Sequence, residues 1–304
     1  MSYFDSIEQD LRDAHSRDVQ HHRRRNRRRR IAGGTTLLAL AVALTALVST
    51  PRDHTATAAA WLSTASAKAA EATNSPARIR VEMGGLIRFG NGPRSWTLLS
   101  RGATYTQTLT ADGRLRNIDS SQGTRTPAGP RDRARWIAAG MPEIPDIPVV
   151  LGQPVQIGEQ GRADPNKLPT DPDALLKRLQ HRVASNEHPR EALFIIAGEL
   201  LFDPVVRPPL RAALFDALTR VEGIVVDEHA TDRLGRPGAA ISLTSRYSEE
   251  TGSWRTGDST TKTTLLFDRE TTRALSREVT LLSRLRGIDV PPGTLIAYRT
   301  YTYS

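Results

Sequence analysis

The feature that most constrains this chain is a junction near its start, where arginines meet an uncharged apolar stretch. Seven of the eight residues 23–30 are arginine, and residues 31–48 carry no charge. An α-helix over 31–48 would span roughly 27 Å, close to a hydrocarbon core of about 30 Å. The sequence therefore predicts one transmembrane helix, anchored by Arg27, Arg28, Arg29 and Arg30 at its start and by Leu37, Leu40, Leu44 and Val48 along its length.

The same charge asymmetry predicts the orientation of the chain. Arginine-rich flanks of membrane segments stay on the cytoplasmic side. We expect residues 1–30 to form a basic cytoplasmic tail, residues 49–55 a short linker, and residues 56–304 an extracytoplasmic domain. The chain would then be a single-pass protein of the plasma membrane.

Two other interpretations of the junction stay open. Ala56-Thr57-Ala58 has the small-x-small pattern of a signal-peptidase site, so the apolar segment could belong to a cleaved signal peptide. Its length exceeds the 7–15 apolar residues usual in such peptides. The segment could also be a buried helix of a soluble core, although its leucines and valines surround the helix on all sides.

The net charge of +9 does not indicate a nucleic-acid-binding protein. Residues 1–30 hold nine arginines against five acids, so nearly half of the excess lies beside the predicted membrane segment. Basic residues interleaved with aromatics on one folded face, which nucleic-acid binding requires, are not found. The absence of cysteine excludes thiol catalysis, zinc–thiolate sites and iron–sulfur clusters.

The tail itself contains a short amphipathic pattern. Phe4, Ile7 and Leu11 fall on one side of a helix, and acidic residues occupy the rest. We consider these three residues a candidate docking face for a cytoplasmic partner. A frayed tail that only precedes the arginines would give the same pattern.

The remaining chain predicts an α+β fold. An alanine-rich helix over 56–72 precedes strands at 77–83, 96–99, 104–110 and 115–119, with Asp112-Gly113 as a two-residue hairpin turn. A proline-rich stretch and a helical insert at about 172–222 follow. Further strands are expected at 225–230, 239–247, 261–267, 274–282 and 295–303. Consecutive hairpins indicate a large antiparallel sheet.

No residue constellation in the sequence names a reaction. His181 and His188 are seven residues apart, but Pro189 predicts that the helix has ended before His188. The acidic pairs 227–228, 249–250 and 268/270 fall in predicted turns or strand ends, where solvated carboxylates are usual. Trp254 could contact a ligand or fold back on the sheet. We expect no catalytic residue, cofactor or metal site.

Three segments carry a resemblance to known proteins. Helix 205–221 with Gly223-Ile224, the run 232–239 (DRLGRPGA) and the run 266–271 (LFDRET) form a pattern that resembles actinobacterial single-pass membrane proteins often encoded beside extracytoplasmic-function sigma factors. The 267–271 turn is also similar to periplasmic half-barrels, the lipoprotein carriers and sigma-E regulators. The resemblance implies a curved antiparallel sheet whose concave face is covered by helices around a cavity for acyl chains or peptides. It implies no catalytic residues.

These observations predict a non-enzymatic envelope protein with an exported sensor or binding domain. Its partners would be the membrane, a lipid or peptide ligand outside, and a cytoplasmic regulator such as a sigma factor. A lipid or lipoprotein carrier or structural envelope module without signalling is the alternative, and a secreted hydrolase is a more remote one.

Overall fold

The computed structural model describes residues 51–73, 77–89, 96–111, 113–142, 164–186, 188–246, 259–284 and 290–304. The described helices and strands lie in the compact unit of residues 52–154 and 165–304, apart from Pro51 at the start of the first helix. The predicted docking residues Phe4, Ile7 and Leu11 and all predicted anchor residues lie outside the described residues. Among the described helices, none is long and apolar enough to span a membrane.

Five α-helices occur in the described part: α2 (Pro51–Glu71), α3 (Pro130–Ala138), α4 (Pro172–Val183), α5 (Pro189–Leu201) and α6 (Pro208–Leu218). Proline stands at the start of each of α3 to α6, where its fixed φ suits the first turn and its missing N–H is not needed. Asp171 caps α4, because its Oδ1 accepts a hydrogen bond from the amide of Ala174 at 2.8 Å.

In the described part of the chain, nine strands form one antiparallel sheet in the order β3-β2-β1-β9-β8-β7-β6-β5, with β4 pairing on β2. Their bounds are β1 (Ala77–Phe89), β2 (Trp96–Leu109), β3 (Leu115–Ser121), β4 (Thr124–Pro127), β5 (Val225–Thr231), β6 (Pro237–Ser245), β7 (Thr261–Phe267), β8 (Ala274–Leu281) and β9 (Leu295–Tyr303). The prediction of an α+β fold with a large antiparallel sheet is confirmed.

The C-terminal strand β9 lies in the middle of this sheet. It pairs with β8 on one side and with β1 on the other, where Val81 stands opposite Tyr301. The amides of Arg78 and Ser304 exchange hydrogen bonds with each other's carbonyls beyond the last pair. Strands β1–β4 and β5–β8 therefore belong to one sheet only through β9.

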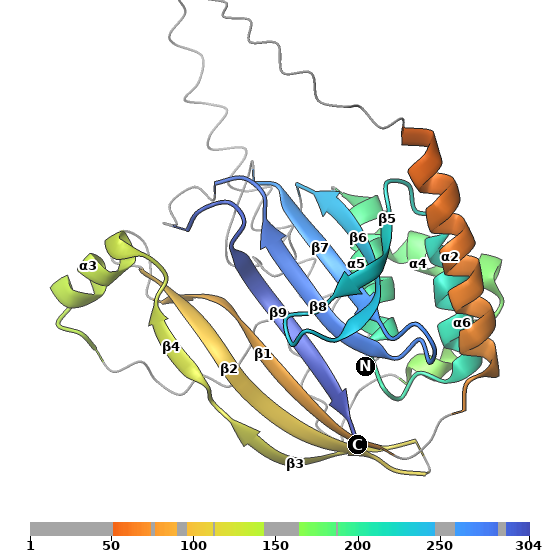
Figure 1. Cartoon of the computed structure of the whole chain (residues 1–304), viewed down its shortest axis with the longest axis horizontal. Coiled ribbons are helices and arrows are strands. Elements are labelled where there is room, and N and C mark those ends of the chain that lie inside the picture. Colours follow the sequence, from red (N-terminus) through yellow and green to blue (C-terminus); the bar gives the residue numbers. More distant parts are fainter. Residues whose placement is uncertain are drawn as a thin grey trace, which may run out of the picture. The chain divides into compact units, whose positions relative to one another are not determined.

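Helices α2, α4, α5 and α6 gather beside β5–β8, whereas α3 lies at the end of β2 and β4 (Figure 1). Aromatic side chains fill the layer between helices and sheet. The ring of Phe267 from β7 lies 5.2 Å from Phe215 of α6, 5.4 Å from Phe202 and 6.5 Å from Trp61 of α2. Gly198 of α5 approaches the sheet so closely that a Cβ there would lie 2.9 Å from Leu265.

Three local predictions were wrong. Helix α2 begins at Pro51 and not at residue 56, consistent with the preference of proline for the first helical turn. The strands predicted at 96–99 and 104–110 are one strand, β2. A bulge opposite Gly84, with Gly102 at φ +70°, keeps that strand continuous.

The third error is the turn between β2 and β3. Its loop has three residues, 111–113, because Thr110 and Arg114 still pair through a 2.9 Å hydrogen bond. Gly113 adopts φ +78°, which is the left-handed residue that a three-residue hairpin loop requires.

Candidate functional site

Two buried arginines and one half-buried glutamate form a cluster between α5 and the sheet, which we call the inner cluster. Arg277 of β8 and Arg299 of β9 stand opposite each other in register, so their side chains share one face. Glu199 of α5 reaches both of them: its Oε1 lies 2.5 Å from Nη1 of Arg277, and its Oε2 lies 3.1 Å from Nη1 of Arg299. Arg277 and Arg299 are only 3% and 5% exposed.

The electrostatics of the inner cluster favour the ionised carboxylate. Burial alone would raise the pKa of Glu199, but Arg299 and Arg277 outweigh it and hold that pKa below its ordinary value. Burial raises the pKa of Tyr105 and of Tyr301, whose phenols face the same region. Both tyrosines therefore stay neutral at physiological pH.

In the inner cluster two guanidinium groups share one carboxylate. The cluster lies beside the aromatic contact between Phe202 and Tyr301, whose ring centroids are 5.3 Å apart. Guanidinium groups bind carboxylates and phosphates through paired hydrogen bonds. The inner cluster can thus hold an acidic group.

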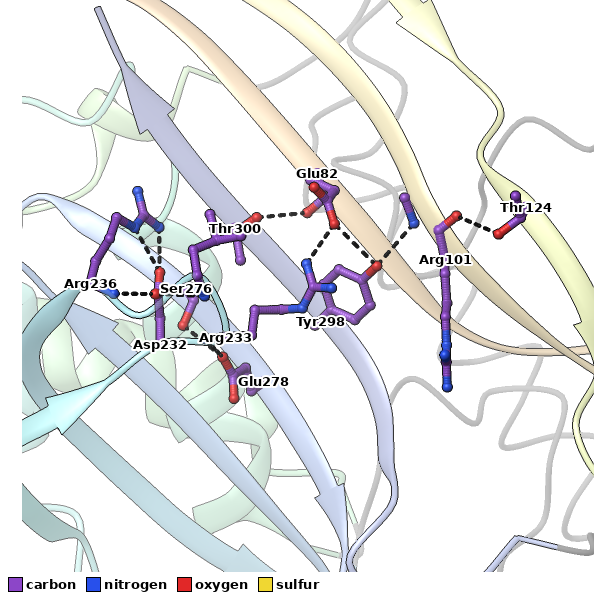
Figure 2. A network of polar contacts seen from close by, with 12 residues as sticks. Glu82, Arg101, Thr124, Asp232, Arg233, Arg236, Ser276, Glu278, Tyr298 and Thr300 are labelled. Atoms are coloured by element: carbon purple, nitrogen blue, oxygen red, sulfur yellow. Dashed lines mark hydrogen bonds and ion pairs between the residues drawn. The ribbon is translucent and has the colours of Figure 1, made fainter.

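A second polar network lies on the opposite face of the same strands and is called the outer network (Figure 2). Arg233 from the β5–β6 turn pairs with Glu82 of β1, Nη1 to Oε1 at 2.5 Å, and its guanidinium carbon lies 3.9 Å from the ring centroid of Tyr298. The Tyr298 hydroxyl lies 3.4 Å from Oε1 of Glu82 and accepts from the amide of Gly102 at 3.0 Å. The network joins the hairpin tip to the two central strands.

The outer network begins at the turn between β5 and β6, which is part of the segment 232–239 (DRLGRPGA) that carries the resemblance described above. The buried carboxylate of Asp232 accepts from the amides of Leu234 and Arg236, both at 2.9 Å, and closes the turn around Gly235 at φ +76°. The Arg236 guanidinium bonds Asp232 and also donates to the carbonyls of Tyr301 and Leu275. These residues secure a folded hairpin against the sheet.

The LFDRET segment is likewise a structural turn. Asp268 Oδ1 accepts from the amides of Glu270 and Thr271, at 3.0 and 2.7 Å, and from the Thr271 hydroxyl at 2.7 Å. Burial alone would raise the pKa of Asp268, but the hydrogen bonds from Thr271 and Glu270 lower it. Lys68 of α2 donates to the carbonyl of Arg269 at 2.8 Å, so the turn also holds α2.

The structure describes only some of the sequence-derived catalytic candidates. His188 precedes α5 and His181 lies in the last turn of α4, so the two histidines do not share a helix. Glu249, Glu250 and Trp254 lie outside the described residues. Over the described part of the chain, no group of three or more His, Cys, Asp or Glu side chains could hold a metal ion.

Sequence reasoning missed both networks. One signal was present for the inner cluster: Glu199 is the only charged residue in the apolar run 192–202. Its partners lie 78 and 100 residues away along the chain, so the sequence could flag a buried charge but could not name its counterions.

Comparison with family models, with curated proteins and with solved structures gives no match to this chain.

Proposed function

We propose that this chain is a non-enzymatic envelope protein, anchored by one transmembrane helix, whose exported domain binds a ligand and regulates a cytoplasmic partner such as a sigma factor. The arginine–apolar junction over 23–48 supports the anchor and the orientation. The start of α2 at Pro51 supports a short connection between that anchor and the domain.

The order of elements supports a half-barrel-like domain. One helix, four strands, a helical region and five strands in a single antiparallel sheet follow the order that the resemblance to lipoprotein carriers and sigma-E regulators implies. In this proposal the sheet curves around α4, α5 and α6, and the ligand binds between them and the sheet.

The observation that carries the binding proposal is the inner cluster. Arg277 and Arg299 share Glu199 within an aromatic layer, so a ligand with an acidic group and an apolar body would match both parts of the site. A lipid headgroup or a peptide carboxylate has this chemistry.

The ligand can be tested on the full chain purified from native membranes. We expect solvent extraction and mass spectrometry to recover an acidic lipid or peptide from the wild type and much less from Arg299→Gln. Arg233→Gln is the matched control, because it removes a guanidinium from a Glu–Arg pair on the opposite face. An empty wild type, or equal ligand in both variants, would contradict binding at the inner cluster.

The regulatory part needs a separate experiment. The full chain is solubilised from crosslinked native membranes, and the proteins that co-purify are identified. A sigma factor or another cytoplasmic regulator that is lost when residues 1–19 are deleted would support the relay. Recovery of lipid or envelope proteins alone, unaffected by that deletion, would favour the carrier or structural module instead.

A further inference from the structure

Helix α3 and the residues directly after it expose large apolar side chains to solvent. In the described residues six large hydrophobic side chains are strongly exposed, and two of them, Ile137 at 51% and Met141 at 57%, lie at the end of α3. The other four are on separate segments. Arg133 and Ile137 are one helical turn apart, so the exposed side of α3 combines a cation with an apolar side chain.

This helix is held firmly, so its exposed side has a defined direction. The buried carboxylate of Asp132 accepts from the amide of Thr97 in β2 at 2.9 Å, which fixes α3 to the sheet. The indole of Trp136 donates to the carbonyl of Pro142 at 3.1 Å and secures the end of the helix. α3 therefore presents its exposed residues on a rigid support, at the end of β2 and β4 (Figure 1).

The backbone conformation of Met141 is a second, independent indication that this surface contacts something outside the fold. It adopts φ +50°, a left-handed conformation that L-residues with large side chains rarely take, and glycine would adopt it with less strain. The amide of Met141 donates to the carbonyl of Trp136 at 3.0 Å, so the helix end imposes this conformation. A strained position that carries an exposed methionine points to a role for that side chain outside the fold.

The charge around α3 indicates what the surface contacts. Helix α3 itself contains three arginines, at 131, 133 and 135, against one acidic residue, the buried Asp132. Apolar side chains among arginines match the boundary of an anionic bilayer, where the apolar groups enter the headgroup region and the cations meet phosphates.

We propose that α3 docks on the surface of an anionic lipid bilayer through Arg133, Ile137 and Met141. The inference rests on the proposed anchor for one reason only, which is that tethering keeps the bilayer at high effective concentration. Two apolar side chains and one helix give a weak contact, so docking responds to lipid charge and to salt. The side of the domain that carries α3 would then face the membrane.

The absence of cysteine makes a single-site probe possible. Ile137→Cys in the full chain is labelled with the polarity-sensitive dye NBD and reconstituted into nanodiscs. One set contains phosphatidylcholine and the other a mixture of phosphatidylcholine and phosphatidylglycerol. We expect the NBD emission to shift to the blue only in the anionic discs and to return in high salt. Adding Arg133→Glu changes the charge of α3 by two units, so it should lower the ratio of docked to free α3 by about 25-fold.

Val225→Cys is the matched control, because Val225 is a β-branched side chain of similar exposure, 47%, on β5. Its NBD spectrum should be the same in both lipids. Equal spectra for Ile137→Cys in the two lipids, or an equal shift at position 225, would overturn the proposal. A chain that enters neither disc would refute the anchor, and the same labelled variants mixed with vesicles of both compositions would then decide on α3.

Discussion

Replacing Glu199 with glutamine tests the inner cluster most directly, because the change keeps the shape of the side chain and removes its charge. Arg277 and Arg299 would remain buried without the carboxylate that they share. Removing one partner of a buried ion pair costs about 3–5 kcal/mol. The Glu199 side chain is 31% exposed, so solvent screens part of this cost, and we expect about 3 kcal/mol.

The assay is thermal unfolding of the full chain in mild detergent, followed by circular dichroism. For a domain of this size 1 kcal/mol corresponds to about 2–4 °C in Tm, so Glu199→Gln should lower Tm by about 6–12 °C. Glu270→Gln is the control, because that carboxylate is 87% exposed and lies 3.6 Å from Lys68. It should change the stability by less than about 0.5 kcal/mol.

A second variant separates charge from packing. Changing Glu199 to leucine and both arginines to methionine removes all three charges and keeps apolar volume, so most of the lost stability should return. If Glu199→Gln leaves Tm within about 2 °C of the wild type, the charges of the inner cluster are solvated and the reasoning fails. If the apolar triple variant is less stable than Glu199→Gln, packing rather than charge dominates.

Three further changes follow from the same structure. The arginines hold the pKa of Glu199 below its ordinary value of 4.5. The ionised carboxylate therefore stabilises the fold fully above pH 4.5, and this stabilisation is lost as the pH falls through the lower pKa of the folded state. In a pH series of thermal unfolding, Tm should fall less steeply in acid for Glu199→Gln than for the wild type. Gly84→Ala would place a Cβ 2.6 Å from Cε1 of Tyr298 and should cost about 2 kcal/mol in urea unfolding. Asp232→Ala leaves the half-buried guanidinium of Arg236 without its carboxylate, and should cost about 3 kcal/mol by the same measurement.

The elements of the fold could be predicted from the sequence where local pattern decides them. Strands β7 and β9 have the predicted bounds, 261–267 and 295–303, because threonine, tyrosine and aliphatic residues, which favour strands, run between clear turns. The capped start of α4 at Asp171 was equally readable. The break predicted between residues 99 and 104 is absent, because a bulge opposite Gly84 lets β2 continue through it.

The sites could not be predicted, because their residues meet only through the sheet. Glu82 and Tyr298 are 216 residues apart, and their contact depends on β9 pairing with β1. A single sequence holds the periodicity of each strand but not the order of strands across a sheet. The docking face at Phe4, Ile7 and Leu11 and the anchor over 31–48 stay predictions.

The central place of β9 has a consequence for how the domain is made. As the chain emerges, β1–β4 and β5–β8 can each form hairpins, but their shared neighbour is the last strand to appear. The inner edge strands of the two halves, β1 and β8, therefore remain unpaired until residues 295–303 have been synthesised and pair with both. Unpaired edges invite association with other chains, and contacts between distant residues slow folding. A chain shortened before Leu295 would therefore yield two separate sheets with open edges, and we expect it to aggregate or be degraded in the cell rather than persist as a partial domain.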